Sequence, residues 1–194
     1  MATKDYTADI TICIPTKNNL PTIKLILNAL NYQDIYPKII VFDNGSIDGT
    51  LEAMQTMIKN KVLGDLDVEL IDFGEWTGIR EQNLDKMRYE LSQMVKTKYL
   101  MFIDADVLIP PYVIIPMLDQ MEKDVNIGML GLKYDVMAEH VKIGASILRT
   151  NLTQGIVWNR ENNKCNCLCA IEYMQLRGFK AEHFPTTARH LLAF

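Results

Sequence analysis

Apolar segments alternate with amphipathic segments over the first 106 residues of the chain. Four segments rich in β-branched and aromatic side chains are typical of buried strands, at residues 9–14, 38–43, 68–73 and 98–103. Between them, apolar residues recur three or four positions apart and predict helices around residues 23–30, at about 50–60 and at about 78–96. This alternation predicts a mostly parallel sheet that is covered by helices on both faces.

The pattern changes after residue 106. A helix at about residues 111–123 precedes two strand-like segments, 127–134 and 141–150, and a final helix is expected at about 167–177. The chain shows no internal repeat, no low-complexity tract and no linker. We therefore expect an α/β fold made of one domain, residues 1–194, with a mixed second half.

Composition and charge restrict the classes of function. A net charge of −4 and a pI near 5.4 argue against a nucleic-acid-binding protein, which usually has a basic excess. No apolar run approaches the roughly 20 residues that span a bilayer. The first 15 residues lack the basic flank and apolar stretch of a signal peptide, so we expect a cytoplasmic protein without a transmembrane segment.

The four cysteines do not form a recognisable metal motif. Cys13 lies in an apolar run and is expected in the core. Cys165, Cys167 and Cys169 alternate without a fourth ligand nearby, which does not match the usual zinc spacing. We therefore expect these side chains to pack rather than to bind metal.

Polar residues cluster where three of the predicted strands end. Residues 15–18 (PTKN) follow the first strand, residues 43–46 (DNGS) the second, and residues 104–106 (DAD) the fourth. In open α/β sheets, ligands bind at the carboxyl ends of the strands. The three polar segments together predict a binding site at this edge of the sheet.

Asp104 and Asp106 are compatible with three kinds of chemistry. A nucleotide hydrolase also needs a G-x-x-x-x-G-K-[ST] loop, which is absent from the sequence. A haloacid-dehalogenase-type phosphatase uses D-x-D-x-[TV], which residues 102–108 imitate, but here half the chain precedes the motif and no second acidic pair follows. The third possibility, which we favour over these and over an exposed acidic turn, is a Mg²⁺ or Mn²⁺ ion that bridges a nucleotide diphosphate.

Three segments then resemble a known family. ITICIPTKNN, KIIVFDNGSIDGT and YLMFIDADVLIP are similar to the amino-terminal blocks of family 2 glycosyltransferases, which have the GT-A fold. IGASILR and GFKAEHFPTTARH, at residues 143–149 and 178–190, are similar to later blocks. The resemblance covers residues 9–190. It implies a Rossmann-like, mostly parallel central sheet, with a nucleotide-binding half at about 9–106 and an acceptor half at about 107–190.

The resemblance also implies roles for residues at the predicted edge. The nucleoside would be contacted by Pro15, Thr16 and Lys17, the base by Asp43 beside a turn at Gly45 and Ser46, and the base or diphosphate by Arg80. The ribose and the metal would be held by Asp104, Asp106 and His190. Three of these residues have plain structural alternatives, namely a helix cap for Asp43, a solvated helix position for Arg80 and an exposed terminal histidine for His190.

The position of the catalytic base departs from the family pattern. In the inverting mechanism that the resemblance implies, a carboxylate just before the final helix accepts the proton of the acceptor hydroxyl. Asn166 or Cys167 occupies that position here. Glu161 is our first candidate for a displaced base and Asp135 the second, whereas Glu172 falls inside the helix. A retaining mechanism and a binding module without efficient transfer remain alternatives.

The implied ligands follow from the same resemblance. We expect a UDP- or GDP-sugar donor, Mn²⁺ or Mg²⁺, and a glycan, protein or lipid-linked acceptor. Trp158 could stack on a sugar or pack in the core. A nucleotidyltransferase, as a further enzymatic alternative, would normally carry a glycine-rich loop near the amino terminus, where PTKNNLP has no glycine.

Overall fold

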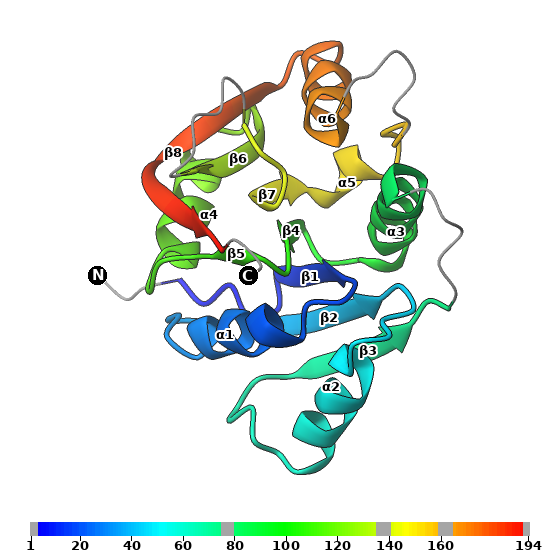
Figure 1. The fold of residues 1–194 in the computed structure, drawn as a ribbon. Helices are drawn as coiled ribbons and strands as arrows, with labels where there is room; N and C mark the ends of the chain where they lie inside the picture. Colours follow the sequence, from blue (N-terminus) through cyan, green and yellow to red (C-terminus); the bar gives the residue numbers. More distant parts are fainter. Residues whose placement is uncertain (1–3, 75–79, 135–140, 159–164, 192–194) are drawn as a thin grey trace.

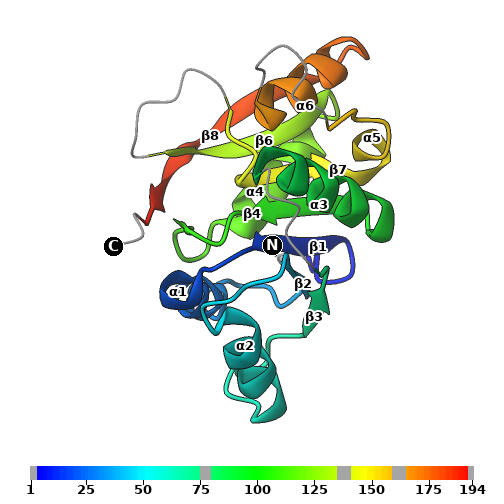
Figure 2. The same ribbon diagram turned by 45° about the vertical axis from the view of Figure 1, so that its right-hand side comes forward.

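The computed structural model describes residues 4–74, 80–134, 141–158 and 165–191, with the backbone alone at residues 80–82. Over these residues the chain forms one twisted sheet with helices packed on both of its faces (Figure 1). Figure 2 shows the same arrangement from the side, with α2 and β3 at one end of the sheet and β8 towards the other.

The first half follows the predicted alternation of strands and helices. Its elements are β1 (Ile10–Thr16), α1 (Leu20–Leu30), β2 (Lys38–Asp43), α2 (Thr50–Lys59), β3 (Val68–Asp72), α3 (Arg80–Met94) and β4 (Tyr99–Ile103). β1 pairs in parallel with β2 and with β4, and β2 pairs in parallel with β3. The predicted parallel sheet is therefore confirmed for this half, with β3 as its half-exposed edge strand.

The second half is mixed, as expected. Its elements are β5 (Val107–Leu108), α4 (Ile114–Lys123), β6 (Ile127–Tyr134), β7 (Ala145–Arg149), α5 (Thr150–Thr153), α6 (Asn166–Gln175) and β8 (Lys180–His190). β7 runs antiparallel to β4 and to β6, whereas β8 runs parallel to β6 and antiparallel to β5. Across the described residues the strand order is β3-β2-β1-β4-β7-β6-β8-β5.

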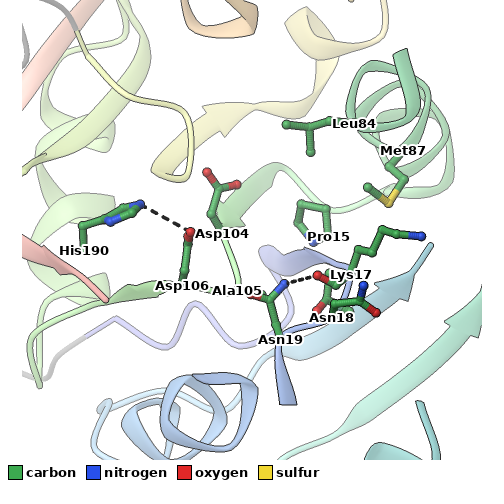
Figure 3. Close-up of a pocket in the computed structure, with 11 residues that line it drawn as sticks. Pro15, Lys17, Asn18, Asn19, Leu84, Met87, Asp104, Ala105, Asp106 and His190 are labelled. Atoms are coloured by element: carbon green, nitrogen blue, oxygen red, sulfur yellow. Dashed lines mark hydrogen bonds and ion pairs between the residues drawn. The ribbon is translucent and has the colours of Figure 1, made fainter. Parts of the chain in front are cut away.

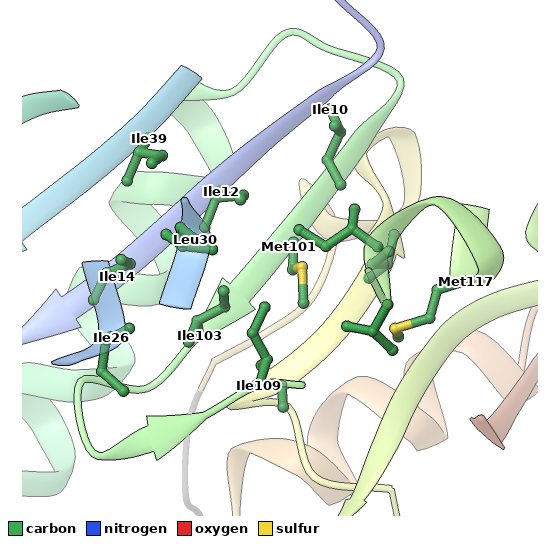
Figure 4. Close-up of a cluster of buried hydrophobic side chains, with 14 of the residues drawn as sticks. Ile10, Ile12, Ile14, Ile26, Leu30, Ile39, Met101, Ile103, Ile109 and Met117 are labelled. Carbon is green, nitrogen blue, oxygen red and sulfur yellow. The ribbon is translucent and has the colours of Figure 1, made fainter. Parts of the chain in front are cut away.

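The core is divided by the sheet into two apolar layers. Successive residues of a strand point to opposite faces, so Ile12 and Ile14 of β1 pack with α1, α2 and α4, whereas Cys13 packs with α3 and α6. Figure 4 shows the first layer, in which Leu30 and Met101 are both fully buried. Each such side chain contributes roughly 1.5–3 kcal/mol relative to its exposed state. Because both faces are covered, the polar strand ends are left to form a site.

Two of the differences from the sequence-based prediction have identifiable reasons. The helix expected from residue 111 begins at Ile114, because Tyr112 has a φ of 56° and the side chain of Gln33 accepts the backbone N–H groups of Val113 and Ile114. β8 was not predicted, because Pro185 interrupts it where its register with β6 shifts.

No helix in the described part of the chain is long and apolar enough to cross a membrane.

Candidate functional site

A cavity of about 440 Å³ opens at the carboxyl ends of β1 and β4 (Figure 3). The loop after β1, the Asp104-Ala105-Asp106 turn, α3 and the last residue of β8 all contribute to its wall. The lining residues are Pro15, Thr16, Lys17, Asn18, Asn19, Leu84, Met87, Asp104, Ala105, Asp106 and His190. Parallel pairing of β1 with β4 brings the two polar segments to one edge, as the sequence predicted.

The Asp104-Ala105-Asp106 turn is held rigidly by backbone hydrogen bonds. Val107 N–H donates to the carbonyl of Asp104 at 2.9 Å, and Leu191 N–H donates to the carbonyl of Asp106 at 2.6 Å. Pairing of β5 with β8 sets Val107 opposite His190. The turn therefore presents two carboxylates with different, fixed surroundings.

The two carboxylates of this turn face different partners. Asp106 Oδ2 lies 3.3 Å from His190 Nε2, a contact drawn as a dashed line in Figure 3. Asp104 Oδ1 instead accepts a hydrogen bond from Arg88 Nη2 at 2.8 Å. Among the described residues, no three His, Cys, Asp or Glu side chains are grouped so as to hold a metal ion. The structure thus pairs two of the predicted metal ligands, Asp106 and His190, and directs the third to an arginine.

Asp106 and His190 nevertheless fit part of a metal coordination shell. Their side chains are both about one-third exposed, at 30% and 33%, and both line the cavity. A carboxylate oxygen and an imidazole nitrogen are suitable ligands for Mn²⁺, and an ion of this kind takes its remaining ligands from water and substrate phosphate. The residues present are therefore compatible with a divalent ion at this pair.

The loops after β1 and β2 are joined by side-chain hydrogen bonds. Lys17 Nζ donates to the carbonyls of Asn44 and Gly45 at 3.0 and 3.1 Å. Asn18 has a φ of 52°, accepts the N–H of Ile47 at its Oδ1, and donates its own N–H to Ser46 Oγ. These bonds fix the polar rim of the cavity and orient Lys17 along it.

Asp43 does not line the cavity. Its carboxylate is fully buried, with Oδ1 accepting the N–H of Ser46 at 2.9 Å and Oδ2 accepting the Ser46 hydroxyl at 2.6 Å. Asp43 does not cap α2 either, because the N-cap of that helix is Gly49 and the residue before it, Asp48, accepts the N–H of Thr50. Asp43 therefore braces the turn at Gly45 and Ser46, and its contact with a nucleobase stays a prediction.

Two buried polar side chains near this turn have no hydrogen-bond partner within the described part of the chain. They are Thr16, a residue of the cavity lining whose hydroxyl is buried, and Asn44, whose amide oxygen and nitrogen are both unpaired there. Asn44 N–H donates to the carbonyl of Thr16, so the two residues are adjacent. Buried polar groups without a partner are rare in folded proteins and often mark a site for water or ligand. Sequence reasoning did not identify Asn44, because its position within DNGS gave no chemical signal.

Arg88 is the second residue that sequence reasoning missed. It falls on the apolar side of α3, four positions after Leu84 and three before Leu91, and its side chain is only 4% exposed. An arginine on the buried face of an amphipathic helix was a signal in the sequence, because such a charge needs an anionic partner.

The predicted catalytic bases and one predicted binding side chain are not placed. Glu161 and Asp135 lie outside the described residues, and Arg80 is described only as the first residue of α3. At the start of α6, Asn166 and Cys167 are buried and the first turn carries no acidic residue. Burial raises the pKa of the Cys167 thiol, whose sulfur accepts the N–H of Ile143. The absence of a carboxylate from this position is thus seen in the fold as well as in the sequence.

Trp158 packs in the core rather than on an open sugar-binding face. Its ring is 6% exposed and meets Phe102 edge to face, with ring centroids 6.0 Å apart. Cys13 and Cys167 are buried, whereas Cys165 and Cys169 are partly exposed, and all four are free thiols.

Comparison with solved structures shows the same fold in known glycosyltransferases. A TarS structure from S. aureus superposes with a TM-score of 0.72 at 15% identity, covering 94% of this chain and 60% of that one. The mannosyltransferase PcManGT from Pyrobaculum calidifontis, in complex with GDP-Man and Mn²⁺, superposes with a TM-score of 0.77 at 15% identity. This match covers 95% of this chain and 57% of that one. Glucosyl-3-phosphoglycerate synthase from Mycobacterium tuberculosis superposes with a TM-score of 0.61 at 15% identity, and the match covers 95% of this chain and 72% of that one. The chain thus spans about 60% of the length of the first two solved chains, and 36% of a longer TarS chain.

These neighbours have the GT-A fold, and the expected fold class is confirmed by them. No curated protein matches the sequence. A family model described as Glycosyl transferase family 2 matches residues 11–171, which include β1, β2, the Asp104-Ala105-Asp106 turn and most of α6. Because this match covers most of the length of the chain, the chain belongs to glycosyl transferase family 2.

Proposed function

We propose that this chain transfers a sugar from a nucleoside-diphosphate donor to an acceptor hydroxyl. The observation that carries the proposal is the cavity at the ends of β1 and β4, where the polar loop after β1 meets two carboxylates and a histidine. Two of the solved neighbours support a donor of this class, since PcManGT was solved with GDP-Man and Mn²⁺ and TarS with UDP. Family membership argues against the phosphatase alternative.

In this proposal the donor's nucleoside lies along the loop after β1. Pro15, Thr16 and Lys17, which line the cavity, contact it, and the Thr16 hydroxyl supplies a polar group to the base or ribose. Gly45 and Ser46 shape the neighbouring turn, with Asp43 beneath it. Arg80, which begins α3, is proposed to reach the base or the diphosphate as a cation.

The diphosphate is proposed to lie between the Asp104-Ala105-Asp106 turn and the end of β8. Asp106 and His190 would hold a Mn²⁺ or Mg²⁺ ion there, and such an ion neutralises negative charge on a leaving diphosphate. Asp104 accepts hydrogen bonds from the hydroxyl groups of the donor's ribose and so positions it. Fixed charges and donors of this kind favour the transition state because they need no rearrangement during the reaction.

The acceptor's proton requires a base from outside the standard position. We propose Glu161 first and Asp135 second, each from a segment next to α6 or β6 in the chain, in an inverting displacement at the anomeric carbon. A glycan, a protein or a lipid-linked sugar fits as acceptor. One observation favours a second candidate, a sugar-nucleotide-binding module with weak transfer, because the first turn of α6 carries no acidic residue.

Calorimetry and product analysis test the proposal together. UDP and GDP are titrated with and without Mn²⁺, and UDP-glucose, UDP-N-acetylglucosamine and GDP-mannose are then assayed for nucleotide release. We expect binding of one nucleotide that depends on Mn²⁺ and is lost in Asp106→Asn. Absence of any nucleotide binding would contradict the donor site. Binding without release, unchanged by Glu161→Gln or Asp135→Asn, would favour the binding module.

A further inference from the structure

Arg88 lies in the middle of α3 and points into the protein rather than into solvent. Its side chain is 4% exposed, and the centre of its guanidinium is 5.9 Å from the centroid of the Phe102 ring. Leu84 and Met87 of the same helix line the cavity beside it. The arginine is thus buried directly behind the wall of the proposed donor site.

Stability alone does not account for an arginine at this position. Among the described residues the guanidinium makes one ion pair, from Nη2 to Asp104 Oδ1, and its buried Nε has no hydrogen-bond partner there. Removing a charge from water is costly unless its hydrogen bonds are fully satisfied, and well-packed apolar side chains are often as stable as a buried ion pair. A methionine would fill the same space against Phe102 without this cost. We therefore expect the contact between Arg88 and Asp104 to serve the function of the site.

Gly144 confines Asp104 from another direction. Asp104 N–H donates to the Gly144 carbonyl at 2.8 Å, and a Cβ atom at position 144 would overlap the Asp104 carboxylate. The carboxylate is therefore fixed by Arg88 at one oxygen and by the Gly144 backbone, while it stays one-third exposed at the cavity. It cannot turn freely towards Asp106 and His190.

The pairing also changes the charge of the site. Arg88 offsets the charge of Asp104, whereas the carboxylate of Asp106 lies against His190. Two uncompensated carboxylates would repel a nucleoside diphosphate, and in a partly buried cavity this repulsion is stronger than in water. A paired Asp104 can still accept hydrogen bonds from hydroxyl groups.

We propose that Arg88 is a positioning residue of the donor site, which holds Asp104 as an oriented and charge-compensated hydrogen-bond acceptor and leaves metal binding to Asp106 and His190. This inference rests on the proposed donor site. Arg88 acts through Asp104 and does not itself touch the donor.

Binding measurements on four proteins test the role of Arg88. Wild type, Arg88→Met, Arg88→Lys and Arg149→Met are titrated with Mn²⁺ alone by electron paramagnetic resonance, and with UDP and GDP in saturating Mn²⁺ by calorimetry. Arg149 is a matched control, because it donates to the carbonyls of Ile127 and Met121 and pairs with Tyr99, at the opposite end of β4 from Asp104.

Arg88→Met is expected to shift the two affinities in opposite directions. Nucleotide binding should weaken about tenfold, because a hydrogen bond to a charged group is lost and Asp104 is no longer oriented. Binding of Mn²⁺ alone should tighten about threefold, since the released carboxylate adds an uncompensated charge. Arg88→Lys keeps the positive charge but lacks the planar guanidinium group. Its Mn²⁺ affinity should therefore equal that of wild type, whereas its nucleotide affinity should stay below that of wild type. Arg149→Met should lower the melting temperature and leave both affinities unchanged.

A double-mutant cycle with Asp104→Asn decides whether Arg88 acts through Asp104. If it does, adding Arg88→Met to Asp104→Asn causes little further loss of nucleotide affinity, whereas independent effects would add. Should Arg88→Met fail to fold, Asp104→Asn and Arg88→Lys still decide the matter. The inference is overturned if Asp104→Asn lowers Mn²⁺ affinity as much as Asp106→Asn, or if both Arg88 variants bind like Arg149→Met. Wild-type protein that binds neither nucleotide nor Mn²⁺ would instead contradict the donor site itself.

Discussion

The imidazole Nε2 of His190 lies 3.3 Å from the carboxylate Oδ2 of Asp106, although the two residues are far apart in the sequence. The contact exists because the two-residue strand β5 pairs antiparallel with the end of β8, which sets Val107 opposite His190. The sequence identified both residues as metal ligands by resemblance. The strand pairing gives a physical reason why they would act together.

Asp106→Asn and His190→Ala should each weaken Mn²⁺ binding at least tenfold, because each removes one of about two protein ligands of an ion that takes its other ligands from water and phosphate. Electron paramagnetic resonance of Mn²⁺ in the presence of UDP or GDP measures the effect. Asp65→Asn, an exposed carboxylate remote from the cavity, is the control for a change of net charge. Equal loss in all three variants would indicate a general charge effect and no metal site.

Removing the brace beneath the second loop should destabilise the protein. Ser46→Ala deletes the hydroxyl that donates to Asp43 and should cost about 1 kcal/mol, while Asp43→Ala leaves two donors of Ser46 unpaired and should cost about 1–3 kcal/mol. Chemical denaturation measures both changes. Thr56→Ala, at an exposed helix hydroxyl, should lie within about 0.5 kcal/mol of wild type. If Asp43→Ala left stability unchanged and abolished nucleotide binding, the direct base contact would be the better explanation.

Much of the fold was predictable because its signals are local. Apolar runs of β-branched residues and helical spacing between them defined β1 to β4 and the helices α1 to α3 without knowledge of the tertiary structure. The pattern failed at β8, where Pro185 and alternating partial exposure hide a strand that is formed by long-range pairing with β6. Helix α4 began late for a similar reason, since its first N–H groups bind Gln33, which is distant in the sequence.

The site was predictable in its location but not in its internal contacts. Parallel pairing brings strand ends together, so the motifs after β1 and β4 had to meet. Which carboxylate faces a cation depends instead on the rotation of α3, which turns Arg88 inwards, and on the register of β5 with β8. Neither the rotation of the helix nor the register of the strands can be predicted from a local sequence pattern. The surroundings of Asp43 were likewise not predictable from a local pattern. Its acidic side chain suggested a ligand contact, whereas in the structure it is buried and accepts the hydroxyl of Ser46.

Gly144→Ala should damage the site more than the fold. Position 144 has no positive φ, so the backbone tolerates alanine, but the added methyl group would displace the Asp104 carboxylate. We expect nucleotide affinity to fall about tenfold, the loss of one charge-assisted hydrogen bond. Gly178→Ala is the opposite case, with open space around it and a φ of 78°, so it should cost about 1 kcal/mol of stability without affecting binding. Comparable binding losses in both variants would argue that overall stability limits the affinity.

Glu122 of α4 should contribute to the acid sensitivity of the fold. Its carboxylate accepts hydrogen bonds from Lys98 at 2.6 Å and Lys4 at 3.1 Å, and these cations lower its pKa from the ordinary 4.5 to about 2. A carboxyl group with a lower pKa in the folded state than in the unfolded state stabilises the protein above the unfolded value, and this contribution is lost as the pH falls from about 4.5 towards 2.

Glu122→Gln removes this contribution. The variant should be less stable than wild type at pH 7 by about 1 kcal/mol or less, as expected for ion pairs near the surface. The difference should shrink as the pH is lowered from about 4.5 towards 2, because the wild-type carboxyl group then becomes protonated. Urea denaturation at several pH values measures it, with the exposed Glu52→Gln as the matched control. A difference between wild type and Glu122→Gln that stays constant down to pH 2 would show that the glutamate acts through packing and not through its charge.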